Sequence, residues 1–135
     1  MGFSARLAIK RSSVGLSFDA EVDGTTSSRN LGSVNFDPSL FGLSKTYKFT
    51  ATLSVSDVAR VAEVRLYNLT DGEQVTTGAL TTSSTTMVPL SATLTVGNAA
   101  GNLKPTAKVY QARIYTDGTL VTDRTFLGSA QITVE

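Results

Sequence analysis

The sequence predicts an all-β protein, an antiparallel β-sandwich of jelly-roll type with about eight strands. The first observation is that apolar and polar residues alternate in five stretches, at about 14–22, 47–55, 62–66, 88–96 and 110–114. Successive side chains of a strand point to opposite faces, so each stretch has one apolar face and one polar face. The second observation is that glycine, asparagine, aspartate and proline gather between these stretches, as they do in turns. A closed barrel is the alternative arrangement of the same strands.

The first third of the chain predicts an extended arm followed by the start of a single domain. The arm covers residues 1–12, and the domain covers residues 13–135. The strands expected in this part run over 13–23, 31–36 and 45–56, of which 31–36 is a short edge strand. An Asp-Gly pair ends the first of them, and an irregular connection containing Pro38 precedes the third.

The rest of the chain predicts two hairpins and two further strands. Each hairpin turns at an Asp-Gly pair, which is the strongest short hairpin signal when alternating segments flank it. The pairs are Asp71-Gly72, between strands at 61–69 and 74–80, and Asp117-Gly118, between strands at 107–116 and 119–123. The further strands lie at 87–96 and 125–134. Loops at 81–86 and 97–106 separate these elements.

The composition removes the commonest catalytic and metal-binding chemistry. The 135 residues fit one domain and include no histidine, cysteine or tryptophan. Without cysteine there is no disulfide, no thiolate nucleophile and no cysteine-based zinc site. Proton transfer would fall to Asp, Glu, Lys or Tyr, and nothing in the sequence singles out a catalytic pair of carboxylates. We therefore expect a protein that is not an enzyme and that uses no cofactor and no metal.

One segment has part of a metal-binding pattern. Residues 19–24 match the opening half of a calcium loop, in which oxygen ligands alternate and a glycine makes the turn. The position that should carry the closing glutamate is Asn30, and Ala20 and Val22 follow the apolar rhythm of a strand. We interpret the segment as the polar face of a strand that ends in an Asp-Gly turn.

Charge and hydropathy limit the expected partners. The formal net charge is +1, whereas nucleic acid or an anionic membrane calls for clustered lysine and arginine. No apolar run approaches the roughly 18 residues of a membrane span. The first 11 residues carry three positive charges but lack the continuous apolar region of a signal peptide. We expect no nucleic acid, no membrane, no small-molecule ligand and no secretion through a signal peptide.

Three groups of residues are candidates for contact with a partner. In the arm, Phe3, Leu7 and Ile9 alternate with polar residues, as in an extended strand that pairs with its own sheet or with the edge of a neighbour. In the irregular stretch 36–43, Phe36, Leu40 and Phe41 either cap one end of the sandwich or insert into a partner.

The third group comes from a sequence likeness between the two expected hairpins. Arg65 and Tyr67 precede the first Asp-Gly turn in the same pattern in which Arg113 and Tyr115 precede the second. If both hairpins lie in one sheet, these side chains form an Arg–Tyr surface, and arginine and tyrosine are enriched at protein interfaces. A solvated outer face is the alternative interpretation.

The threonine-rich strands, the segment 66–72 and the ending 126–134 resemble those of small β-sandwich accessory proteins of tailed bacteriophage virions. The likeness covers about residues 45–135. It implies a structural protein that decorates a capsid or belongs to a neck or tail assembly as a symmetric oligomer. The partners would be further copies of the chain or coat and tail proteins, and the location would be the virion. The alternative is a carbohydrate-binding or host-adhesion module, in which the sugar would stack on Tyr47, Tyr67, Tyr110 or Tyr115.

Overall fold

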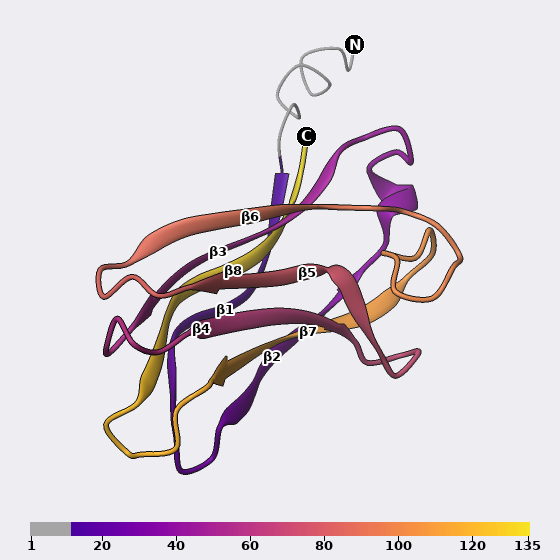
Figure 1. The fold of residues 1–135 in the computed structure, drawn as a ribbon. Coiled ribbons are helices and arrows are strands. Elements are labelled where there is room, and N and C mark those ends of the chain that lie inside the picture. Colours follow the sequence, from indigo (N-terminus) through magenta and orange to yellow (C-terminus); the bar gives the residue numbers. More distant parts are fainter. Residues whose placement is uncertain (1–11) are drawn as a thin grey trace.

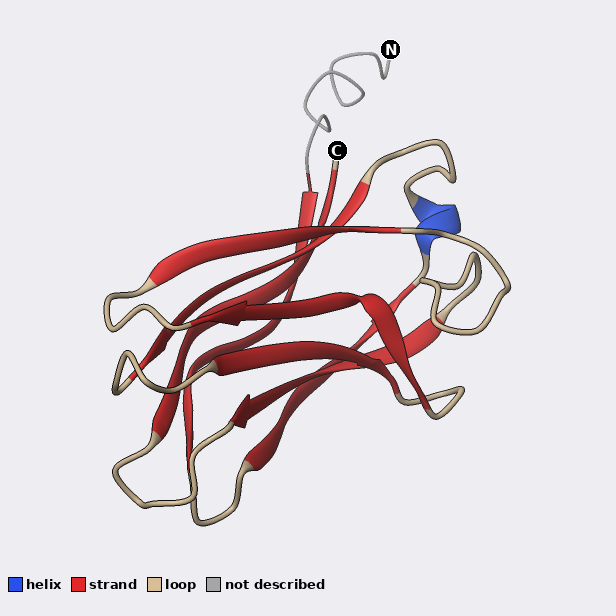
Figure 2. Cartoon of the chain, viewed as in Figure 1, coloured by secondary structure: helices blue, strands red, loops and turns tan. Residues whose placement is uncertain are grey.

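Eight strands make up the fold in the computed structural model, which describes residues 12–135 (Figures 1 and 2). The strands are Ser12–Asp23 (β1), Ser28–Phe36 (β2), Tyr47–Val55 (β3), Ala62–Asn68 (β4), Glu73–Thr82 (β5), Val88–Leu94 (β6), Lys108–Thr116 (β7) and Arg124–Val134 (β8). One short 3-10 helix, Pro38–Leu40 (η1), lies between β2 and β3.

The strands form two four-stranded antiparallel sheets that pack face to face. One sheet has the order β1-β8-β3-β6 and the other has the order β2-β7-β4-β5 (Figure 1). Among consecutive strands only β4 and β5 share a sheet, and every other connection crosses from one sheet to the other. This is the jelly-roll arrangement, so the predicted fold class is confirmed.

The connections between successive strands lie at two opposite ends of the sandwich. The connections β1–β2, β3–β4, β5–β6 and β7–β8 lie at one end, which we call the loop end. The connections β2–β3, β4–β5 and β6–β7 lie at the other, together with the C-terminus, and we call it the terminal end.

The core lies between the sheets and follows the alternation of the sequence. Every second residue of β4 and β7 is buried, and the residues between them are partly exposed on the outer face. The largest fully buried side chains come from both sheets: Tyr47, Phe49, Leu53, Leu66, Tyr110, Ile114, Leu127 and Ile132. Full burial of an apolar side chain of this size stabilises the fold by about 1.5–3 kcal/mol.

The alternation breaks in β1. The pairing of β1 with β8 shifts between Gly15 and Ser17, and Asp19 has a φ of +48°. As a result Leu16 lies in the core, whereas the side chain of Phe18 is 64% exposed on the outside. The alternation at 14–22 predicts that Phe18 shares a face with Leu16. This prediction is wrong, because a β-bulge inserts an extra residue and reverses the direction in which the next side chains point.

One of the two predicted hairpins is confirmed and the other is corrected. β4 and β5 pair directly, and Gly72 supplies a positive φ of +68° in their turn. Residues 117–123 contain no strand, since they cross from β7 in one sheet to β8 in the other. The Asp123 carboxylate folds this loop by accepting hydrogen bonds from the backbone N–H groups of Thr119 and Leu120, at 3.1 and 3.0 Å.

The predicted arm falls almost wholly outside the described residues. β1 already begins at Ser12, so residues 1–11 are the part of the arm that the structure leaves undescribed. Phe3, Leu7 and Ile9 belong to that part. Over residues 12–135, none of the helical structure is long and apolar enough to cross a membrane.

Candidate functional site

The Arg–Tyr surface predicted from the sequence exists on the outer face of the sheet β2-β7-β4-β5. β4 and β7 are direct neighbours, and in their register Arg65 lies opposite Arg113. The strands are antiparallel, so Tyr67 and Tyr115 lie two residues away on opposite sides of this pair. All four side chains point outward and are partly exposed. We call Arg65, Tyr67, Arg113 and Tyr115 the Arg–Tyr face.

Each arginine of this face lies over the tyrosine of the other strand. The Arg113 Cζ is 3.5 Å from the centre of the Tyr67 ring, and the Arg65 Cζ is 4.0 Å from that of Tyr115. Both contacts are cation–π interactions, which in exposed positions contribute about 0.5–1 kcal/mol each. The stacking therefore orders two guanidinium groups on neighbouring strands at the outer face of the sheet.

Polar neighbours on the same strands hold the guanidinium groups further. Arg65 Nη2 donates to Glu63 Oε1 at 2.9 Å, and this hydrogen bond is the main reason that the pKa of Arg65 is raised. Arg113 Nε donates to the Gln111 side-chain oxygen at 3.0 Å. One carboxylate thus stands beside two guanidinium groups, and the centre of the face carries a net positive charge.

The tyrosines do not form a free platform for a sugar. Tyr47 and Tyr110 are fully buried in the core. The rings of Tyr67 and Tyr115 each have one face covered by a guanidinium group. A sugar ring would have to displace an arginine to stack there, whereas a protein partner could hydrogen-bond to the arginine edges directly.

The second predicted group, at 36–43, divides between core and surface. Phe36 is only 2% exposed; its ring stacks on Phe41, with the centroids 5.5 Å apart, and meets Tyr47 edge-on. The prediction that Phe36 reaches a partner is therefore corrected, since the alternation of β2 places it inside. Phe41 is partly buried against the core, in the capping role, and Leu40 is 79% exposed.

A buried tyrosine fixes the loop that presents Leu40. The Tyr47 hydroxyl donates to the backbone oxygens of Pro38 and Gly42, at 2.9 and 2.7 Å. Burial raises the pKa of Tyr47, so the group stays a neutral donor. The connection between β2 and β3 is thereby tied to the core.

Two ion pairs at the terminal end tie the β6–β7 connection to the β4–β5 turn. Lys104 Nζ lies 3.2 Å from Glu73 Oε2, and Lys108 Nζ lies 3.1 Å from Asp71 Oδ1. The pKa of Glu73 is lowered, first by the backbone N–H of Gly101 and then by Lys104. A cleft of about 430 Å³ opens beside these groups, but its two lysines and two carboxylates balance in charge. These two ion pairs therefore hold the β6–β7 connection against the β4–β5 turn.

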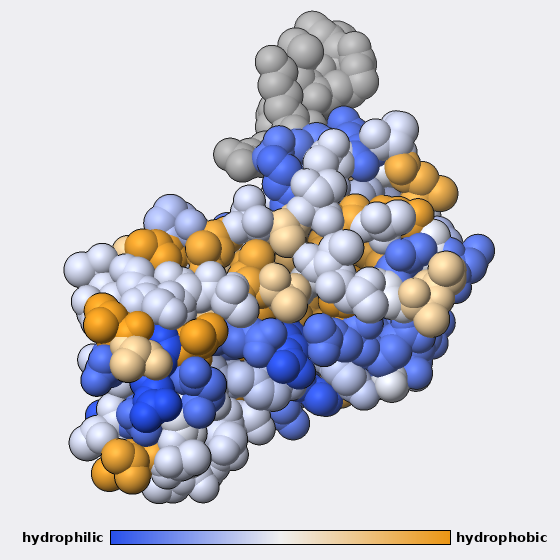
Figure 3. All heavy atoms as spheres, viewed as in Figure 1, coloured by the Kyte–Doolittle hydropathy of each residue, from blue (hydrophilic) through white to orange (hydrophobic). Residues whose placement is uncertain are grey.

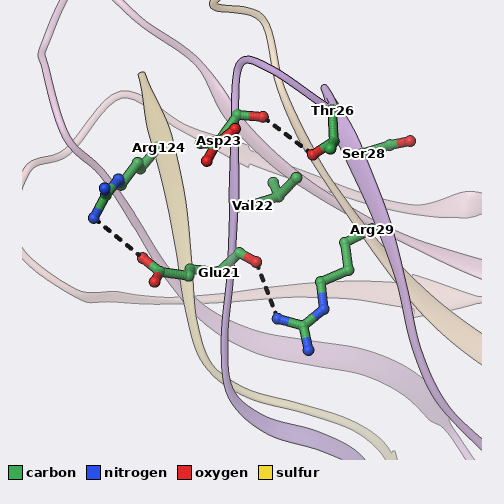
Figure 4. A pocket seen from close by; sticks show the side chains of 7 residues that line it. All are labelled: Glu21, Val22, Asp23, Thr26, Ser28, Arg29 and Arg124. Carbon is green, nitrogen blue, oxygen red and sulfur yellow. Dashed lines mark hydrogen bonds and ion pairs between the residues drawn. The ribbon is translucent and has the colours of Figure 1, made fainter. Parts of the chain in front are cut away.

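A second cleft, of about 290 Å³, lies at the open edge of the sandwich between β1 and β2 (Figure 4). Glu21 stands between two arginines: its carboxylate is 3.8 Å from Arg124 Nη1, and its backbone oxygen accepts from Arg29 Nη1 at 3.2 Å. Asp23 accepts hydrogen bonds from the backbone N–H and the hydroxyl of Thr25. The turn predicted after β1 uses this aspartate locally, and no group of three or more metal-ligating side chains occurs within residues 12–135.

The loop end carries exposed apolar residues that the sequence reasoning missed. They are Val58 and Val61 in the β3–β4 connection and Leu120 and Val121 in the β7–β8 connection. Val58, Leu120 and Val121 are 71%, 60% and 53% exposed. The prediction of a strand at 119–123 concealed the last two, because it assigned them to a sheet.

Comparison with known proteins gives relatives by structure alone. No protein-family model and no curated protein matches the sequence. A chain of the infectious bursal disease virus particle is similar over 93% of this chain and 30% of its own, with 13% identity and a TM-score of 0.56. The VP2 subviral particle of the same virus gives 14% identity and 0.52, covering 93% and 32%.

A carbohydrate-binding domain is similar to the same extent. It is the CBM36-1 domain of a multidomain xylanase from the hindgut metagenome of Trinervitermes trinervoides, with 9% identity and a TM-score of 0.53 over 93% of this chain and 97% of that domain. The present chain spans about a third of the length of the viral chains. At these identities the comparisons establish the shared β-sandwich fold.

Proposed function

We propose that this chain is a non-enzymatic structural protein of a virion or a similar particle, acting through protein–protein contacts as a capsid decoration, neck or tail component. The observation that carries the proposal is the Arg–Tyr face, in which two guanidinium groups are ordered by stacking on the outer face of a sheet. The fold it stands on is shared with a chain of a viral particle. Arginine and tyrosine are, with tryptophan, the residue types enriched among the interface residues that contribute most to binding.

In this proposal the chain contacts its partners through three surfaces. The Arg–Tyr face offers ordered guanidinium groups to carboxylates and backbone oxygens of a neighbour. Leu40 offers an exposed apolar side chain, on a β2–β3 connection that hydrogen bonds from Tyr47 hold to the core. The arm links the domain to neighbouring subunits as a clasp, so identical copies of the chain are partners alongside coat or tail proteins.

The second candidate function is carbohydrate binding, favoured by the likeness to the CBM36-1 domain over nearly its whole length. Its weak point is the placement of the tyrosines, since two are core residues and two are covered by arginine. We rank it below the structural role for that reason.

Removal of residues 2–11 tests the structural role. We expect the truncated protein to have a smaller assembly mass than the full chain in sedimentation velocity. Its unfolding temperature should stay unchanged, because the eight strands remain complete. An unchanged assembly mass after truncation would contradict the clasp.

A glycan array separates the two candidate functions. The structural role predicts no glycan signal above that of an unrelated β-sandwich protein. A reproducible signal that is lost in Tyr67→Ala and Tyr115→Ala variants would favour the carbohydrate-binding module instead.

A further inference from the structure

We propose that the loop end of one copy binds the arm, residues 1–11, of a second copy. The inference rests on the proposed function, because it supplies the surface on which the clasp would close. It depends on three features: exposed apolar residues, unpaired acidic residues and the place where the arm joins the sandwich.

The apolar side chains of the loop end sit on loops that hydrogen bonds hold together. The Val61 N–H donates to Asp117 Oδ1 at 2.8 Å, and the Ser56 hydroxyl donates to the Thr122 backbone oxygen at 2.9 Å. The connections β3–β4 and β7–β8 are therefore neighbours, and together they carry the exposed residues Val58, Val61, Leu120 and Val121. Figure 3 shows separate areas of hydrophobic surface at this end, with strongly hydrophilic surface beside them. Such a pattern suits a segment in which apolar and charged residues alternate.

The charges of this end are unbalanced toward the negative. Arg60 pairs with Asp123, with 3.2 Å between Nε and Oδ1. Asp57 and Asp117 are exposed, and neither forms an ion pair with any residue of 12–135. Their carboxylates cap backbone N–H groups of the β3–β4 connection and keep their charge available to a cation.

The arm has the complementary chemistry. Its apolar residues are Phe3, Leu7 and Ile9, and its charged residues are Arg6, Lys10 and Arg11. Residues 1–11 contain no aspartate and no glutamate. An extended segment of this composition can set apolar side chains against the valines and leucine of the loop end while its cations meet Asp57 and Asp117.

The arm joins the sandwich at Ser12, at the end opposite the chain's own loop end. Residue 11 precedes Ser12, whose backbone pairs with Val134 at the terminal end. β1 then runs through 12 residues before it reaches the loop end, a distance of about 40 Å. Eleven residues span at most about 36–40 Å when fully extended, so residues 1–11 would reach their own loop end only by running back along the entire sandwich. The loop end of a neighbour is the accessible one.

An interface of this kind joins different surfaces of two identical copies. It is heterologous, so repetition closes into a ring or continues as a chain of subunits. The proposal thus predicts head-to-tail association.

Disulfide cross-linking tests the contact directly, since the natural chain contains no cysteine. The Leu7→Cys variant is mixed with the Val121→Cys variant under mild oxidation. We expect a linked pair of two chains from the mixture, and much less from either variant alone. The matched control replaces Val121→Cys with Leu43→Cys, which places a thiol of similar exposure at the terminal end, since Leu43 is 55% and Val121 53% exposed. Equal or stronger linkage to residue 43, or no linkage to residue 121, would overturn the proposal.

Substitutions in the receiving surface give a second test that leaves the fold intact. Leu120→Ser with Val121→Ser removes exposed apolar groups, and we expect association to weaken at least about tenfold in sedimentation equilibrium. Asp57→Asn with Asp117→Asn keeps both capping oxygens and removes two charges, so it should weaken association and reduce its dependence on salt. Leu43→Ser, which removes an exposed apolar group at the terminal end outside the proposed contact surfaces, is the control and should leave association unchanged.

The outcomes separate this inference from the proposed function. If the full chain associates but the loop-end variants associate equally well, the inference fails and the structural role stands. If the full chain is monomeric at every concentration tested, the inference fails, and the role of the arm as a clasp between copies fails with it.

Discussion

The two ends of the sandwich are built in different ways. At the terminal end, a core tyrosine and two ion pairs hold the connections, and Leu103 of the β6–β7 connection is completely buried. At the loop end, aspartate side chains hold the connections through backbone N–H groups, and the apolar residues point outward. The connections of the terminal end pack Phe41 and Leu103 against the core and leave Leu40 and Leu43 exposed. The apolar residues Leu120 and Val121 of the β7–β8 connection at the loop end are both exposed and free for contact.

The largest expected difference between the ends concerns two leucines in loops. Leu103→Ala opens a cavity in the core and should lower the free energy of unfolding by about 2–5 kcal/mol. Leu120→Ala removes an exposed side chain and should change it by less than about 0.5 kcal/mol. Urea denaturation of the two variants measures both values, and equal losses would contradict the distinction between the ends.

The next effect in size comes from the tyrosine at the terminal end. Tyr47→Phe keeps the buried ring but removes the hydroxyl that donates to the backbone oxygens of Pro38 and Gly42, which retain only their backbone donors. We expect a loss of about 0.5–1.5 kcal/mol in the free energy of unfolding and faster hydrogen exchange over residues 37–46. Tyr67→Phe is the control, because the Arg113 contact uses the ring and not the hydroxyl. A Tyr47→Phe protein as stable as the natural one would show that the loop needs no such tie.

A smaller effect is expected on the Arg–Tyr face. A double-mutant cycle with Arg113→Ala and Tyr67→Leu should give a coupling energy of about 0.5–1 kcal/mol from denaturation curves. A coupling near zero would mean that the stacking does not order the guanidinium group. Such a result would contradict the interpretation of the Arg–Tyr face as a surface whose side chains are ordered before a partner binds.

The smallest expected effect is the change in the pH dependence of stability when one carboxylate, Asp123 or Glu73, is replaced. The pKa of Asp123 at the loop end is lowered mainly by the Leu120 N–H, and that of Glu73 at the terminal end mainly by the Gly101 N–H. A lowered pKa contributes stability above the unfolded value of about 4, and this contribution is lost as the pH falls through the folded value. The unfolding temperature should therefore fall below about pH 4, and Asp123→Asn or Glu73→Gln should each flatten part of that decline. Variants that follow the same acid curve as the natural protein would contradict these hydrogen bonds.

The sequence alone predicts the fold class well, for a physical reason. A strand with one wet face must alternate, and a jelly roll made of short antiparallel strands shows that alternation in β3, β4 and β7. It also indicates that the two Arg-x-Tyr segments form one surface if their strands share a sheet, and the pairing of β4 with β7 meets that condition.

The failures have physical causes as well. Phe18 lies outside the core because the bulge between Gly15 and Ser17 changes the register of β1. A bulge depends on how a strand pairs with its neighbour, and the alternation of one segment does not show it. The second Asp-Gly pair does not make a hairpin, because β8 finds its partners β1 and β3 in the other sheet. The exposed residues of the loop end escape the sequence-based prediction in part because the alternation places Val61 in a strand at 61–69, and Leu120 and Val121 in a strand at 119–123.

The molar mass of the full chain at rising concentration tests the central claim most directly. The account predicts that sedimentation equilibrium will show masses that grow in multiples of the 14.2 kDa chain and fall when salt screens the acidic loop end. A mass of one chain over the whole range, in low salt as in high, would contradict an account in which this jelly roll works by binding its own neighbours.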